Sequence, residues 1–145
     1  MKSVFLDYAT VSQGDLNPSS LIEAAPQLQI RELTSQADVA ETISGHAVVL
    51  LNKLQLTRDI ILGAQDLRLV ALAATGTNNI DLQAAKEKGV AVCNIRDYCS
   101  ASVAQHVLGV LLMLTHKLRE YSRDAIDGTW AQSQHFTILD HPIRE

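Results

Sequence analysis

The feature that most constrains the fold is an uncharged apolar run, residues 69–74, that stops abruptly at Thr75-Gly76-Thr77. A run of this kind is typical of a strand covered on both faces, as in a parallel sheet. A helix pattern begins soon afterwards, with Asp81 as a possible cap. Because loops at the carboxyl ends of strands form the ligand crevice of an open α/β sheet, we expect this turn to line a crevice. Glycine tolerates a positive φ and leaves its amide unshielded, so a ligand could approach Gly76 closely.

The same alternation of strand and helix patterns occupies the first 94 residues. Strands are predicted at 2–6, 28–33, 46–51, 69–74 and 90–93, and helices beginning near Pro18, Ser35, Thr57 and Asp81. Five such units with short connections predict an α/β fold, a doubly wound parallel sheet with right-handed crossovers.

After Asn94 the pattern changes. One long helix is predicted from Ser100 or Ser102 to about Asp127, apolar on nearly every side in its first half, with Gly128 ending it and an irregular tail over 130–145. A helix that is apolar all round must be buried on all sides, and one small domain can cover only one of them. We therefore expect this helix to pack against another domain or a second subunit.

Composition narrows the class of protein. The net charge of −4 and the absence of clustered Lys and Arg argue against a nucleic-acid partner. The stretch 98–116 has no Lys, Arg, Asp or Glu, but polar residues are scattered through it, so we expect no membrane span. With no leader pattern at the start and with Cys93 and Cys99 expected to stay reduced, a cytoplasmic protein is the simplest interpretation.

Catalytic motifs are missing from the chain. No G-x-G-x-x-G fingerprint, G-x-S-x-G elbow or H-E-x-x-H helix occurs. His135 and His141 have a spacing that arises often by chance, so we do not expect them to bind a metal. His106 is expected to be a buried, hydrogen-bonded histidine, and Cys93 is expected in the core.

Polar residues at two strand ends leave alternatives open. Asp7 either caps a turn or faces the crevice. Asn52 and Lys53 follow the third predicted strand, where they could meet an anionic substrate or simply form a solvated turn. Taken alone, these residues indicate an α/β domain with a ligand crevice and no particular reaction.

Several segments together, in order and spacing, resemble the D-isomer-specific 2-hydroxyacid dehydrogenases. They are Asn52-Lys53-Leu54, Ala74 to Asp81, Gly89 to Asn94 and Ser102 to His106. Gly128-Thr129-Trp130, Phe136 and Pro142-Ile143-Arg144-Glu145 are similar to the glycerate dehydrogenase/hydroxypyruvate reductase branch. The resemblance covers the whole chain, but only the amino-terminal part of such an enzyme.

The resemblance implies a domain organisation. Residues 1–98 would be a flavodoxin-like substrate (catalytic) domain, later completed by a returning segment of the enzyme. Residues 99–145 would be a crossover helix and dimerisation arm leading to a Rossmann domain that binds NAD or NADP. The glycine fingerprint and the catalytic Arg, Glu and His of the family would lie beyond this chain, which we therefore expect to be inactive alone.

The resemblance also implies site residues. Thr75 and Gly76 match the turn whose main-chain amides bind the substrate carboxylate, and Asn52 and Lys53 match the neighbouring substrate loop. Val103 matches a position close to the nicotinamide ring, making it the one cofactor-binding residue expected here. At the next polar position, Gln105 stands where the family commonly has glutamate, which leaves open any contact across the subunit interface.

The implied function is reduction of a small 2-keto acid, such as hydroxypyruvate or glyoxylate, to its D-2-hydroxy acid with NAD(P)H. The implied partners are that small acid and a second copy of the chain, joined through the 100–127 helix and arm. A phosphoglycerate-type dehydrogenase is a rival within the same class. A free-standing flavodoxin-like binding module is a rival from another class.

Overall fold

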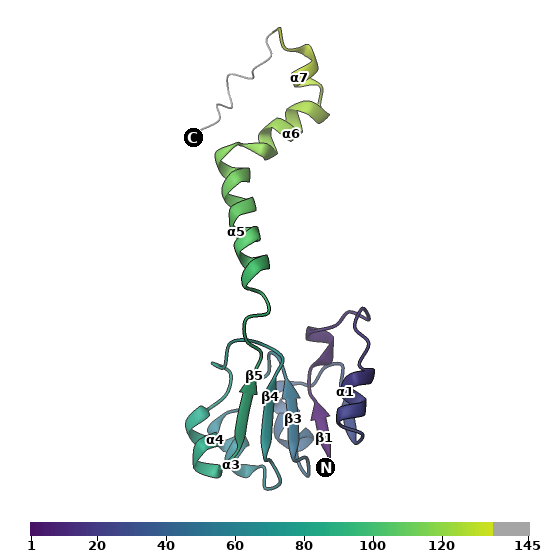
Figure 1. Ribbon diagram of the computed structural model, residues 1–145, viewed down its shortest axis with the longest axis vertical. Coiled ribbons are helices and arrows are strands. Elements are labelled where there is room, and N and C mark those ends of the chain that lie inside the picture. Colours follow the sequence, from purple (N-terminus) through teal and green to yellow (C-terminus); the bar gives the residue numbers. More distant parts are fainter. Residues whose placement is uncertain (135–145) are drawn as a thin grey trace. The chain divides into compact units, whose positions relative to one another are not determined.

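The computed structural model describes residues 1–134, which fall into two compact units, Met1–Arg96 and the part from Asp97 onward. The first unit contains a five-stranded parallel sheet in the order β2-β1-β3-β4-β5 (Figure 1). Its strands are β1 (Ser3–Phe5), β2 (Leu28–Ile30), β3 (Val48–Leu51), β4 (Leu69–Leu72) and β5 (Ala91–Asn94). This flavodoxin-like order confirms the predicted α/β doubly wound fold.

Four helices and two short 3₁₀ turns connect the strands of this unit. They are η1 (Tyr8–Thr10), α1 (Ser19–Ala24), η2 (Gln36–Asp38), α2 (Val39–Thr42), α3 (Arg58–Gly63) and α4 (Leu82–Lys88). The core cluster joins α2, α3 and α4 to alternate residues of β1, β3 and β4. From β2 onward the chain crosses the sheet in one direction, past β1 to β3, β4 and β5. Because each of these crossovers is right-handed, their helices all lie on the same face of the sheet.

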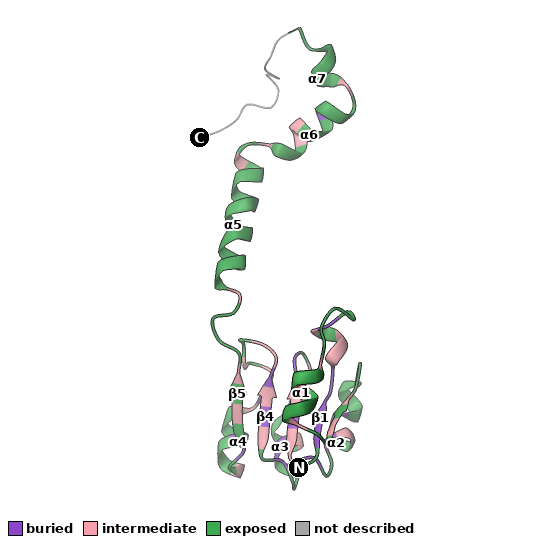
Figure 2. Ribbon diagram, turned by 45° about the vertical axis from the view of Figure 1, so that its right-hand side comes forward, coloured by how far each residue is buried: buried purple, intermediate pink, exposed green. Residues whose placement is uncertain are grey.

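The other face of the sheet is less well covered. Only the crossover from β1 to β2 runs in the opposite direction, so α1 alone falls on this face, opposite α3 and α4 (Figure 1), and none of its residues is buried. Leu69 and Ala71 of β4 are half-buried here, whereas Val70 and Leu72 are buried on the helix-covered face (Figure 2). The prediction that β4 is covered on both faces is therefore wrong for this unit.

Several helix ends lie where local chemistry predicts them. The Asp81 carboxylate accepts a hydrogen bond from the Ala84 amide at 2.8 Å and so caps α4. Gly89 follows α4 with φ of 75°, a left-handed conformation that favours glycine. Strands are shorter than predicted, since β2 ends at Ile30 and β4 at Leu72.

The described part of the second unit, residues 97–134, contains three helices where one was predicted. They are α5 (Ser100–Thr115), α6 (Leu118–Ile126) and α7 (Thr129–Gln132). The break falls at Lys117, whose φ of 50° is left-handed and cannot continue an α-helix. Gly128 follows α6 with φ of 84°, as expected for a helix stop, but α7 then interrupts the tail that was predicted to be irregular. No helix within the described residues is long and apolar enough to cross a membrane.

Two further predictions were wrong. Cys93 is exposed, because it lies on the edge strand β5 and shares its face with Ala91, which is also exposed. His106 is exposed on α5 and is therefore not a buried histidine within the second unit. His135 and His141, together with Phe136 and 142–145, lie outside the described residues.

Candidate functional site

The candidate site lies in the first unit, where the carboxyl ends of β1, β3, β4 and β5 lead into neighbouring loops. The chain reverses its direction across the sheet between β1 and β3, and in open α/β sheets the ligand crevice lies at such a switch point. In this unit the switch point is filled by protein groups, the side chains of Asp7 and Asn52, which are 2% and 8% exposed.

Asp7 holds the loop that follows β3. Its Oδ1 accepts the Asn52 amide at 2.8 Å, and its Oδ2 accepts the amides of Lys53 at 2.7 Å and Leu54 at 3.3 Å. Two roles were left open for Asp7, capping a turn or facing the crevice, and neither describes this geometry fully. The carboxylate faces the switch point, and it uses that position to bind main-chain N–H groups from a different loop.

Asn52 was predicted to meet substrate, but its side-chain donor group is already engaged. Its Nδ2 donates to the carbonyl and the hydroxyl oxygens of Thr10, at 3.2 and 2.9 Å. On the opposite side, Asn79 Nδ2 donates to the carbonyl oxygens of Asn52 and Leu54, at 3.3 and 2.8 Å. Asn52 therefore joins the loops after β1, β3 and β4 and has no amide hydrogen left to offer a ligand.

The turn after β4 has a different character, because its main-chain donors are free. Thr75 and Gly76 are exposed, and the amides of Thr75, Gly76 and Thr77 donate to no acceptor among residues 1–134. The Thr75 carbonyl is held by Asn94 Nδ2 at 2.7 Å, which fixes the start of the turn to the end of β5. Consecutive unpaired N–H groups of this kind are suited to binding an anion.

The backbone conformation at Gly76 does not require a glycine, and the nearest neighbour is the far end of the exposed Asn78 side chain. Its φ is not in the left-handed region, which removes one of the two reasons given for a glycine here. A Cβ at this position would lie 3.1 Å from the side-chain oxygen of Asn78, so any larger residue crowds the turn. The second reason, an unshielded amide, agrees with the exposure of the residue.

Lys53 adds a positive charge beside these groups. Its amide is bound to Asp7, while its side chain is exposed and forms no ion pair within the described part of the chain. Asn79, which follows the Thr75 turn, binds the carbonyls on either side of Lys53, so the two loops are directly linked. The structure thus brings together four of the five predicted site residues on one edge of the sheet.

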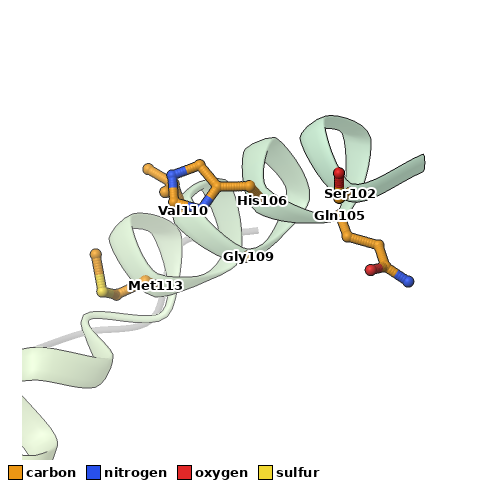
Figure 3. Close-up of a pocket in the computed structure, with 6 residues that line it drawn as sticks. All are labelled: Ser102, Gln105, His106, Gly109, Val110 and Met113. Atoms are coloured by element: carbon orange, nitrogen blue, oxygen red, sulfur yellow. The ribbon is translucent and has the colours of Figure 1, made fainter. Parts of the chain in front are cut away.

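The fifth, Val103, belongs to the second unit. It is exposed on α5. The same helix carries a shallow groove of about 570 Å³, whose lining residues are labelled in Figure 3. Its walls are formed by Ser102, Gln105, His106, Val110 and Met113. Among residues 1–134 no group of three or more His, Cys, Asp or Glu could hold a metal ion.

Two parts of the site were missed by sequence reasoning. Asn79 was given no site role, yet it clamps the loop after β3. Gln36 binds the same loop at Gln55 through two hydrogen bonds of 2.9 Å. The one signal present in the sequence was the amide side chain of Asn79 within a turn already expected at the crevice. Gln36 lies in a helix start and carried no signal.

Comparison with known proteins supplies the family. Residues 9–135 match the model of the D-isomer specific 2-hydroxyacid dehydrogenase catalytic domain. The chain is 34% identical over its whole length to a hydroxypyruvate reductase of Blautia hydrogenotrophica, of which it covers 46%. It is 35% identical over 73% of its length to a glycerate dehydrogenase of Methylorubrum extorquens, of which it covers 34%.

Solved structures agree in fold. An acyclic imino acid reductase in complex with NADPH and D-Arg aligns over the whole chain with a TM-score of 0.81 at 17% identity, and the chain covers 45% of it. An NAD-dependent formate dehydrogenase of Staphylococcus aureus in complex with NAD aligns over 88% of the chain with a TM-score of 0.67 at 25% identity, with 42% of that protein covered. The chain thus spans less than half the length of the proteins it matches. It belongs to the D-isomer specific 2-hydroxyacid dehydrogenase family.

Proposed function

We propose that this chain forms the substrate domain and crossover segment of an NAD(P)H-dependent enzyme that reduces a small 2-keto acid of the hydroxypyruvate or glyoxylate type. The product is the corresponding D-2-hydroxy acid. The names of the relatives, glycerate dehydrogenase and hydroxypyruvate reductase, support this substrate class.

The observation that carries the proposal is the set of free amides at Thr75, Gly76 and Thr77. These N–H groups have no acceptor among residues 1–134, and a carboxylate supplies up to four lone-pair sites for them. Hydrogen bonds from N–H groups to a carboxylate are charge-assisted and about twice as strong as neutral ones. A 2-keto acid placed there is held by its carboxylate, which fixes the position of the neighbouring keto carbon.

The chain's own contribution to cofactor binding is small. A nicotinamide cofactor supplies the hydride for such a reduction. The sequence contains no glycine fingerprint that could hold a pyrophosphate, so we place the dinucleotide site in another part of the enzyme. Val103 is the one residue here that we assign to the nicotinamide, and we assign no catalytic acid or base to residues 1–134.

A phosphoglycerate-type substrate is the second candidate, and Lys53 is the observation in its favour. Several relatives that match 69% to 76% of the chain are D-3-phosphoglycerate dehydrogenases. An exposed lysine without an ion pair could attract a second anionic group on the substrate. The free amides bind the carboxylate of either substrate. We therefore expect the contact between Lys53 and a phosphate group to determine whether the enzyme prefers the phosphorylated acid.

We also propose that the enzyme is a homodimer joined through α5 and the segment after it. No residue of α5 is buried against the rest of the second unit, and its apolar residues face several directions. A contiguous set of exposed apolar side chains of this kind indicates an association surface. The two free cysteines, Cys93 and Cys99, agree with a reducing, cytoplasmic location.

The test is an assay of the complete enzyme. NADH and NADPH oxidation should be followed with hydroxypyruvate, glyoxylate and 3-phosphohydroxypyruvate as substrates. We expect turnover with the first two and a much lower kcat/KM with the phosphorylated acid. Preference for the phosphorylated acid, lost on Lys53→Met, would establish the second candidate instead, and no turnover with any of the three would refute the proposed function.

A further inference from the structure

The loop after β3 is held by side chains from three other parts of the first unit. Asp7 binds its amides, Asn79 binds the carbonyls of residues 52 and 54, and Gln36 binds both main-chain groups of Gln55. The Leu56 amide and carbonyl are bonded to the main chain of Asn79 and Asp81. Main-chain groups of this loop are thus engaged on both sides, in contrast with the free amides of the turn after β4.

Among these clamps, Asp7 has the least replaceable chemistry. It is a buried carboxylate that forms no ion pair among residues 1–134, and three N–H groups from consecutive residues converge on it. An ionised carboxylate offers only acceptors, which suits three donors. An aspartate that only caps a turn accepts hydrogen bonds from amides of its own turn, whereas Asp7 accepts them from a different loop.

We propose that Asp7 is a positioning residue of the substrate site. By fixing the amides of residues 52–54, it sets the direction in which Lys53 leaves the loop. Asp7 also acts on the Thr75 turn indirectly. Asn79, which follows the free amides of that turn, binds carbonyls of the loop that Asp7 holds, so the position of this loop fixes the position of Asn79. Asp7 does not touch the substrate in this scheme, and the inference rests on the proposed function only for its kinetic consequence.

Asp7→Asn is the informative change, because it keeps the shape and alters one atom. Whichever oxygen becomes NH₂, a donor then faces at least one of the three amides. A buried donor left without an acceptor is destabilising, so the loop should leave its position. Asp15→Asn is the matched control: it is the same chemical change in the same β1–α1 connection, at an exposed residue bonded only to Ser12 and Gln13.

Two measurements on the complete enzyme test the proposal. In steady-state assays, Asp7→Asn should raise the KM for the 2-keto acid at least tenfold while the KM for NADH and kcat change less than threefold. In hydrogen–deuterium exchange, the amides of residues 52–56 should exchange faster in Asp7→Asn than in Asp15→Asn. The exchange measurement needs no substrate, so it remains informative even if the proposed activity fails.

The outcomes are distinct. Faster exchange confined to 52–56 with a raised keto-acid KM supports the inference, and faster exchange in an enzyme inactive on all keto acids supports the positioning role while refuting the function. Unchanged exchange together with an unchanged KM in folded Asp7→Asn overturns the inference. A fall in kcat accompanied by an equal rise in the KM values for both substrates also overturns it. If Asp7→Asn fails to fold, Asn79→Ala, which frees the same loop from its carbonyl side, must raise the keto-acid KM, and an unchanged KM in that variant overturns the proposal.

Discussion

Gly76→Ala is the sharpest test of where the substrate carboxylate binds. The added methyl group would lie 3.1 Å from the Asn78 side-chain oxygen, so either Asn78 or the turn must shift. Either the shift or the methyl itself disturbs approach to the free amide at this position. A hydrogen bond to a charged group contributes about 1.5–3 kcal/mol, and about 1.4 kcal/mol corresponds to a factor of ten. We therefore expect the KM for the 2-keto acid to rise about tenfold or more.

The stability of the protein should not fall in the same variant. Gly76 is exposed and its φ is not left-handed, so alanine meets no backbone strain, and the smaller entropy of the unfolded chain favours it slightly. Gly63→Ala is the matched control, because Gly63 also lacks a positive φ and a Cβ there would touch nothing within 4 Å. Steady-state kinetics and thermal unfolding of both variants are the assays. A folded Gly76→Ala enzyme with wild-type KM would refute carboxylate binding at this turn.

Three further predictions concern stability and assembly. Asp81→Ala removes the acceptor for the Ala84 amide and should destabilise the protein by about 1 kcal/mol in urea unfolding. Arg58 donates a hydrogen bond that holds the pKa of Glu87 below its ordinary value. The stabilisation from this pair is therefore fully present above the pKa of Glu87 in the unfolded chain, and it is lost as pH falls through the lowered pKa in the folded protein. The difference in thermal stability between wild type and Glu87→Gln should therefore shrink on acidification. Thermal unfolding at several pH values measures it. Leu111→Glu puts a charge on the exposed apolar surface of α5 and should convert the proposed dimer to a monomer in light scattering.

The sequence predicted the elements of the first unit well because each has a local signal. Asp81 and Gly89 mark the ends of α4 through chemistry that acts within four residues. The parallel direction of the strands was predicted from the alternation of strand and helix patterns. The coverage of the two sheet faces could not be predicted in this way, because it depends on the direction of each crossover. Only the first crossover in this sheet runs opposite to the rest.

The candidate site was predicted less completely. The free amide at Gly76 was inferred from a glycine after an apolar run, which is a local pattern, and the resemblance to the family added the amide of Thr75. The engagement of Asn52 with Thr10 spans 42 residues, and that of Lys53 with Asp7 spans 46. No periodicity or spacing reports such long-range pairing. The break at Lys117 was missed for a different reason, since lysine has no general tendency toward a left-handed conformation.

The unequal covering of the two sheet faces has a consequence for biosynthesis. A chain is made from its amino end, so β1 to β5 can pair while later residues are still being added. The face packed against α2, α3 and α4 is complete at that moment, but the face that bears Leu69 and Ala71 is only partly covered. The newly made first unit thus presents a partly apolar sheet face and an unpaired edge at β5, the two features through which sheets associate wrongly.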